Sequence, residues 1–301
     1  MVTSAITAKN ITGTGPTRAA TGIITMTTNM RSAAAVVGGT NTSAALMNTA
    51  GVLSAPREES AAPAAAPAGH DRACGVLALA RMLEFGDSML PVGAFAFSGA
   101  LESAVQKGVV HDADTLRDFT STALEQAARG DAVGLACVMR AAVADDRAAL
   151  ERADREIYCR KLSEEARLMS VRMGRKLAEM CVEATGPEAM TPWLEGIRAG
   201  RTPGTYPATL GVLFAGLGLS PDQALTTHQY GVATTILNAA LRLMRVTHLD
   251  TQRILFLLIR DFERQCAHAA SAAPEDMCGY APMTDILAAV HVRAHVRLFM
   301  S

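Results

Sequence analysis

The chain has 301 residues, 19% of them charged, and its formal net charge is −1. This near-neutral balance argues against a basic surface for nucleic acid, and we expect no nucleic-acid partner. The six cysteines are widely and irregularly spaced without a Cys-x-x-Cys pair, which argues against a disulfide framework and a zinc knuckle. The longest apolar run, 208–219, is shorter than the ~20 residues that a membrane span needs. We therefore expect a soluble protein with no membrane partner.

Residues 1–70 differ in composition from the rest of the chain. They are rich in Ala, Thr, Ser and Gly, and no acidic residue precedes Glu58. They show no periodic apolar face from which a core could be built, so we predict a disordered, low-complexity segment. Two alternatives stay open. The segment is a targeting peptide, since Ser/Thr-rich and acid-poor composition is typical of transit peptides, or it is an over-extended start of the chain.

The apolar residues after position 74 recur at helical spacing, and the most irregular stretch among them is the loop 87–102. Pro91 should end the helix before it, because proline has no N–H to donate and biases the preceding residue away from helical angles. Gly93 and Gly99 permit backbone conformations or close approaches that a side chain forbids. The stretch therefore predicts a non-regular turn between two helices.

Two aromatic side chains, Phe95 and Phe97, lie between these glycines, and Ser98 and Glu102 follow where the chain becomes helical again. Rings on a loop between helices have two interpretations. They fill the core of their own domain, which residue type alone favours, or they belong to a surface for a partner. Ser98 has no histidine in its own motif that could activate it, so we interpret its hydroxyl as part of a turn or a helix cap.

Capping residues and apolar faces predict the later helices. The predicted caps are Asp112, Ser220 with Pro221 and Gln223 behind it in a capping-box pattern, and Asp250. The helix after Asp250 should bury Leu255, Leu258, Ile259, Phe262 and Cys266 on one face. Another helix should carry an apolar stripe from Leu162 to Met180.

A last short helix is predicted near 284–291, and no segment alternates apolar and polar residues as strands do. We therefore predict an all-α fold, a single globular helical domain of about eight to ten helices over residues 75–301, preceded by the disordered segment.

Signatures of common enzymes are absent from the sequence. It has no Gly-x-x-x-x-Gly-Lys-Ser/Thr loop for phosphates, no Gly-x-Ser-x-Gly nucleophile turn and no His-Glu-x-x-His zinc helix. We therefore expect a protein that is not an enzyme and has no catalytic residues.

The best metal-like spacing is His291-x-x-x-His295, which would place two imidazoles on one helix face. Cys278, Cys266 and His268 are conceivable further ligands. Two histidines at this spacing more often face solvent, which is the interpretation that we favour. A metal-dependent helical enzyme or metal-binding protein is thus the alternative function, although no acid/base constellation accompanies the pair.

Three stretches resemble one known family in the same order along the chain. The loop has Pro91, Gly93 and Phe95 before a Ser98-to-Glu102 step, the later stretch 160–177 has Ser170, Met173 and Gly174, and the end has His291, Arg297, Leu298, Phe299 and Ser301. Together they are similar to the UreF family of urease accessory proteins over about residues 75–301. Two positions depart from its pattern, since family members often have His at Phe97 and Gly at Ala94.

The resemblance implies a cytoplasmic, dimeric, all-helical and non-catalytic protein. Such a protein bridges the accessory protein UreD, also called UreH, and the GTPase UreG, and the complex delivers nickel to apo-urease. Nickel and GTP would then be handled by the partner complex, with no cofactor bound stably by this chain.

The resemblance also implies which residues contact partners. They are Pro91, Gly93, Phe95, Ser98 and Glu102 in the loop, and Arg297, Leu298, Phe299 and Ser301 in the tail. We expect the tail to pack near the loop when UreD/UreH binds, with Arg297 donating to backbone carbonyls there and Phe299 burying its ring. The alternative is a tail that packs on its own last helix.

Overall fold

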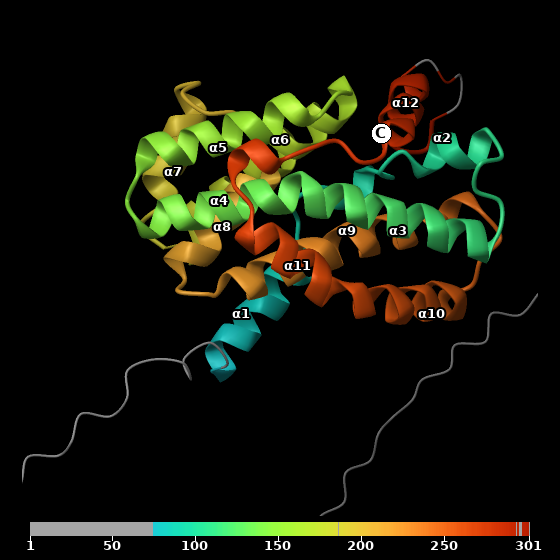
Figure 1. The fold of residues 1–301 in the computed structure, drawn as a ribbon, viewed down its shortest axis with the longest axis horizontal. Coiled ribbons are helices and arrows are strands. Elements are labelled where there is room, and N and C mark those ends of the chain that lie inside the picture. Colours follow the sequence, from blue (N-terminus) through green and yellow to red (C-terminus); the bar gives the residue numbers. More distant parts are fainter. Residues whose placement is uncertain (1–74, 186, 293, 295–296, 301) are drawn as a thin grey trace, which may run out of the picture. The chain divides into compact units, whose positions relative to one another are not determined.

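The computed structural model describes residues 75–185, 187–292, 294 and 297–300, and every regular element among them is helical (Figure 1). The predicted all-α fold is therefore confirmed. The segment 1–70, His295 and Ser301 lie outside the described residues. No helix in the described part of the chain is both long enough and apolar enough to cross a membrane.

The elements follow one another without a strand in the described ranges. The α-helices are α1 (Val76–Gly86), α2 (Leu101–Gln106), α3 (Ala113–Arg129), α4 (Asp131–Val143), α5 (Arg147–Arg160), α6 (Glu164–Met180), α7 (Met190–Arg198), α8 (Tyr206–Gly216), α9 (Pro221–Leu243), α10 (His248–Leu258), α11 (Phe262–Ser271) and α12 (Pro282–His291). Short 3₁₀ turns are η2 (Ala94–Ala96), η4 (Ile259–Asp261) and η5 (Pro274–Asp276), and η3 (Cys181–Thr185) is a π-helical turn. The described ranges thus contain twelve α-helices. If short α2 is counted as part of the loop, and α10 and α11 as one bent helix, the number is ten, which lies within the predicted eight to ten.

Two predicted caps are confirmed and one is wrong. Asp112 caps α3, and Ser220 forms a capping box with Gln223 at the start of α9. The cap of α10 is Thr247, and Asp250 is the third helical residue, whose side chain accepts from the N–H of Thr247. Asp250 therefore occupies the other half of a capping box.

Two residues of the predicted apolar faces lie outside the core. Ser163 is the N-cap of α6, and its hydroxyl accepts from the N–H of Ala166. Leu162 therefore precedes the helix and is exposed. Ile259 is exposed because the 3₁₀ turn η4 changes the helical phase between α10 and α11. Leu258 and Phe262 on either side stay buried.

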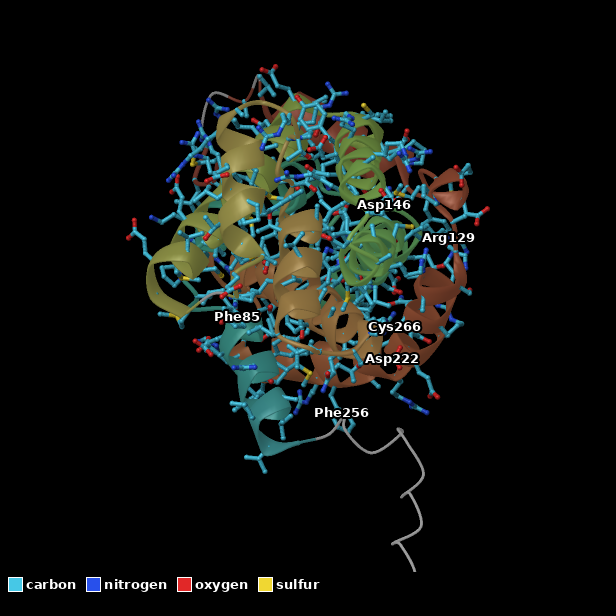
Figure 2. The ribbon with its side chains drawn as sticks, turned by 90° about the vertical axis from the view of Figure 1, so that its left-hand side faces the viewer. Phe85, Arg129, Asp146, Asp222, Phe256 and Cys266 are labelled. Carbon is cyan, nitrogen blue, oxygen red and sulfur yellow. The ribbon has the colours of Figure 1, made fainter. Side chains whose placement is uncertain are left out.

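Helices α4 and α8 pack against each other in the interior, with α5, α6 and α9 around them (Figure 1). Both are apolar on nearly every side, which is typical of a buried helix. Gly211 allows their close contact, because a Cβ there would lie 2.9 Å from Cγ1 of Val138. Helix α1, by contrast, buries only Phe85. Figure 2 shows this residue at the end of α1 that meets the other helices.

A buried carboxylate holds the connection between α7 and α8 onto α5. Asp154 is fully buried and accepts from the hydroxyls of Thr202 and Thr205, at 2.5 and 2.6 Å, and from the N–H groups of Gly204 and Thr205, at 2.6 and 2.9 Å. Four donors satisfy the carboxylate, and no cationic side chain in the described part of the chain forms an ion pair with it.

The Ser170, Met173 and Gly174 step of α6 lies against the same connection. Ser170 accepts from the N–H of Tyr206 at 3.2 Å. A Cβ on Gly174 would lie 2.2 Å from the carbonyl oxygen of Gly204, so only glycine fits there. The step therefore positions the start of α8 on α6.

Candidate functional site

The loop 87–100 between α1 and α2 is held in a strained conformation. Gly93 and Gly99 have φ of +88° and +61°, which their residue type permits. Ala100 has φ of +68°, in a region that disfavours a side chain. Ser98 is buried, and its hydroxyl accepts from the N–H of Glu102 at 3.3 Å. The hydroxyl therefore acts in the turn into α2, as predicted from the sequence.

Replacing Ala100 with glycine is expected to stabilise the domain by about 1 kcal/mol, because the left-handed conformation then carries no side-chain penalty. Urea denaturation measures the change. The matched control is Ala267→Gly on the exposed face of α11, where the same substitution should destabilise by about 1 kcal/mol. Equal signs in the two variants would contradict the strain at Ala100.

The C-terminal tail lies on this loop within the same chain. Both carboxylate oxygens of Glu102 accept from the tail, from the N–H of Leu298 at 2.7 Å and from that of Phe299 at 3.0 Å. The N–H of Met300 donates to the carbonyl of Ala96 at 2.8 Å. The Phe299 ring is buried within the chain by itself. The tail thus packs on the loop and α2, and Phe299 shares a buried cluster with Leu287 and Ala288 of α12.

His291, the last residue of α12, lies between Glu102, which binds the tail, and Glu165 of α6. Its Nε2 lies 2.9 Å from Glu102 and its Nδ1 lies 3.2 Å from Glu165, and all three side chains are buried. Both ring nitrogens are therefore engaged by carboxylates, which leaves neither for a metal ion. Among the described residues, no group of three His, Cys, Asp or Glu side chains is placed to hold a metal.

Glu102 is the centre of this network, and its surroundings favour the ionised form. Burial alone would raise its pKa, but the hydrogen bonds from the backbone of Leu298 and Phe299 and from His291 hold the pKa below its usual value of 4.5. The carboxylate is thus an anionic anchor for the tail at neutral pH.

Arg242, near the end of α9, connects the loop and the tail by stacking. Its guanidinium carbon lies 3.9 Å from the ring centroids of both Phe95 and Phe299. It also donates to the carbonyl of Phe95 at 2.9 Å. Burial lowers the pKa of Arg242. The arginine therefore holds the two aromatic residues in one unit.

The two loop aromatics differ in burial, and the core interpretation holds for Phe97. Phe97 is buried in the core, whereas the side chain of Phe95 is 68% exposed. Of the other residues expected to contact partners, those exposed to solvent are Pro91, Gly93, Arg297 and Leu298, and those buried in the domain are Ser98, Glu102 and Phe299.

Arg297 has a carboxylate partner in the chain by itself. Its guanidinium lies 3.4 Å from a carboxylate oxygen of Glu165, and the donation to loop carbonyls that we expect in the UreD/UreH complex stays a prediction. A buried carboxylate beside the tail attracts the cation more strongly than neutral carbonyls do.

Sequence reasoning missed Glu165 and Arg242 as members of this site. Glu165 lies in the first turn of α6, where acidic residues are common for helix stability alone. Arg242 lies in the last turn of α9, where basic residues are equally common. No local signal therefore distinguishes either residue from an ordinary helix-end charge.

The fold and the site together define an all-α protein in which a loop and the C-terminal tail of the same chain present apolar side chains to solvent. The UreF family model matches residues 110–259. The urease accessory proteins UreF of Yersinia pseudotuberculosis serotype IB, Yersinia pestis and Yersinia enterocolitica serotype O:8 are each 53% identical over 221 residues, which is 73% of this chain and 97% of theirs. This chain belongs to the UreF family of urease accessory proteins.

Proposed function

We propose that this chain is a non-catalytic binding protein that bridges UreD/UreH and the GTPase UreG during GTP-dependent nickel insertion into apo-urease. The observation that carries the proposal is its 53% identity with urease accessory proteins across 97% of their length. In this role the chain acts as a homodimer in the cytoplasm, and its partners carry nickel and GTP. A scaffold of this kind acts by preferring one state of the GTPase, since binding shifts an equilibrium only through differential affinity.

The surface that we assign to UreD/UreH consists of Phe95, Leu298 and Met300. All three side chains are at least 49% exposed, and they come from two segments that hydrogen-bond to each other. Exposed apolar side chains on an ordered backbone favour a protein interface, because little conformational entropy is lost on binding. Two residues hold the backbone under this surface: Glu102 binds the N–H of Leu298 in the tail, and Arg242 stacks on Phe95 in the loop.

The alternative of a metal-dependent enzyme has no observation in its favour. Its principal residue, His291, is buried with both ring nitrogens on carboxylates. His291 serves instead to position the tail that we assign to the interface.

The test is co-purification and titration with the UreD/UreH of the same cell. Leu298→Asp is expected to weaken binding by tens-fold or more, because burial of one large apolar side chain contributes about 2 kcal/mol and the new charge must be desolvated. Leu249→Asp on α10 is the matched control, since Leu249 is also exposed, and it should bind like the wild type.

Equal affinities of the Leu298→Asp and wild-type proteins would refute the assigned surface. Failure of the wild-type chain to bind UreD/UreH or UreG, or to promote nickel-dependent urease activation with them, would refute the bridging function itself.

A further inference from the structure

Helix α10 carries large apolar side chains on the face that points to solvent. Its core face is already filled, since Ile254, Leu255 and Leu258 are buried. On the opposite face, the side chains of Leu249 and Phe256 are 68% and 76% exposed. Figure 2 shows Phe256 at the lower edge of the described helices. The outer face of a surface helix is normally polar, so this face has the composition of a contact surface.

Two arginines alternate with these apolar side chains. Leu249, Arg253 and Phe256 are spaced by four and three residues, which places them on one side of α10, and Arg260 of η4 follows four residues later. We call these four exposed residues the α10 stripe. Arg253 lies 3.5 Å from Asp250, whereas Arg260 forms no ion pair within the described part of the chain. The stripe is therefore both apolar and positively charged.

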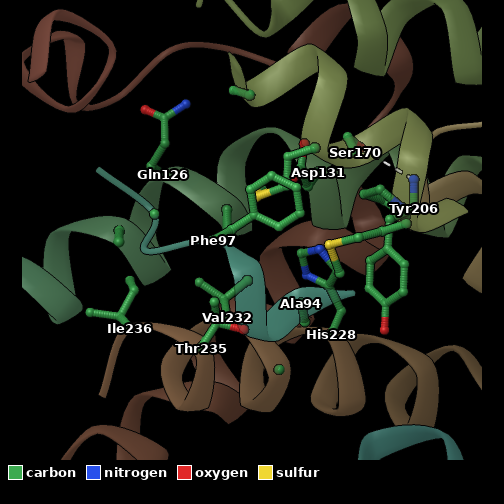
Figure 3. A pocket seen from close by; sticks show the side chains of 18 of the residues that line it. Ala94, Phe97, Gln126, Asp131, Ser170, Tyr206, His228, Val232, Thr235 and Ile236 are labelled. Atoms are coloured by element: carbon green, nitrogen blue, oxygen red, sulfur yellow. Dashed lines mark hydrogen bonds between the residues drawn. The ribbon is translucent and has the colours of Figure 1, made fainter. Parts of the chain in front are cut away.

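A cavity of about 270 Å³ between the loop, α6 and α9 gives no comparable indication of what it binds (Figure 3). Its wall is mainly apolar, and the charges of Asp131 and Lys161 in that wall neutralise each other, with 2.7 Å between Oδ2 and Nζ. The α10 stripe differs in having a cation that the described residues leave unpaired.

We propose that the α10 stripe binds an acidic amphipathic helix of another protein. Leu249 and Phe256 are two helical turns apart, about 10 Å along the axis, which matches the repeat of apolar side chains on a helix that lies alongside. Carboxylates that flank those side chains would pair with Arg253 and Arg260. Aromatic and arginine side chains are also the types enriched at protein interfaces.

The α10 stripe is separate from the surface that we assign to UreD/UreH. Figure 1 shows α10 and α12 at opposite edges of the domain, with α3 between them. The inference therefore goes beyond the proposed bridging through the loop and the tail, and it does not depend on it.

The charge of the stripe favours another protein over this chain as the occupant. A two-fold contact with a second copy would present the same stripe again, and its nearest carboxylate, Asp250, is already bound by Thr247 of its own helix. Residues 1–57 contain four basic residues and no acidic one, so the stripe would repel them. A partner rich in Asp or Glu supplies what both lack.

The probes are two synthetic helical peptides of about 20 residues with leucine on one face, flanked by glutamate in one peptide and by lysine in the other. Each is labelled and titrated with the full chain at a concentration where the peptide is monomeric. Fluorescence anisotropy is expected to show about tenfold or more tighter binding of the glutamate peptide at low salt. This preference should shrink as salt is added.

Arg260→Glu should remove the preference for the glutamate peptide. Arg172→Glu on α6 is the matched control, because Arg172 is also exposed and the change in net charge is the same. Phe256→Ser should weaken binding of the glutamate peptide by about tenfold or more, since one large apolar side chain no longer becomes buried. Leu298→Asp should bind the peptide like the wild type, which keeps this test apart from the UreD/UreH surface.

The proposal is overturned if neither peptide binds, if both bind equally, or if Arg260→Glu and Arg172→Glu behave alike. Three further results would overturn it by identifying a different occupant. Loss of self-association in Phe256→Ser would indicate a second copy, and tighter binding of a peptide of residues 1–57 would indicate the chain's own segment. Binding to phosphatidylserine vesicles that Phe256→Ser abolishes would indicate a membrane surface.

Discussion

Replacing Glu102 with alanine is expected to release the tail and to lower the free energy of unfolding by about 3–5 kcal/mol. The carboxylate is the acceptor for two backbone N–H groups of the tail and the partner of His291. Without it, the N–H of Phe299 and one ring nitrogen of His291 are left buried and unpaired. The loss should appear in chemical denaturation.

Hydrogen exchange separates release of the tail from general destabilisation. The amide of Met300 donates to Ala96 and should exchange fast in Glu102→Ala while amides in α4 stay protected. Glu102→Gln keeps one carbonyl acceptor for the tail and should lose about half as much stability. A Glu102→Ala protein with wild-type stability and a protected Met300 amide would show that the tail is held by other contacts.

Replacing Asp154 with alanine is also expected to lower the free energy of unfolding by about 3–5 kcal/mol, but for a different reason. Two hydroxyls and two N–H groups of the connection between α7 and α8 would lose their acceptor in a buried site. Urea denaturation should show the loss directly.

The single tryptophan gives a second readout for this variant. Trp193 on α7 is buried and donates from Nε1 to Thr209 on α8 at 3.0 Å, so loosening of the connection should shift its emission to longer wavelength. Glu156→Ala on the exposed side of α5 is the control and should change stability by less than about 0.5 kcal/mol. An Asp154→Ala protein as stable as this control would mean that water replaces the carboxylate at no cost.

Features that depend on neighbouring residues could be predicted from the sequence. The capping box of Ser220 and Gln223 needs residues only three positions apart, and the structure has it as expected. The same pattern misled at α10, because Thr247 and Asp250 are both good caps and spacing alone does not say which one starts the helix.

The site could be predicted only in part, because its contacts join distant positions. Resemblance to a family pointed to the loop and the tail, yet it gave no reason to pair Arg297 with Glu165, 132 positions away. Arg242 is 147 positions from Phe95, and no periodicity links them. Asp154 gave no signal either, since a carboxylate among charged neighbours on α5 is more often exposed to solvent than buried.

The pairing of Glu102 with Leu298 spans 196 positions and has a consequence for synthesis of the chain on the ribosome. The residues that complete the network are translated 196 positions after Glu102 of α2. During elongation the nascent chain therefore carries a carboxylate and a loop whose partners do not yet exist. A product that terminated before Leu298 would keep α4 and α8 but would lack the backbone N–H groups that bind Glu102.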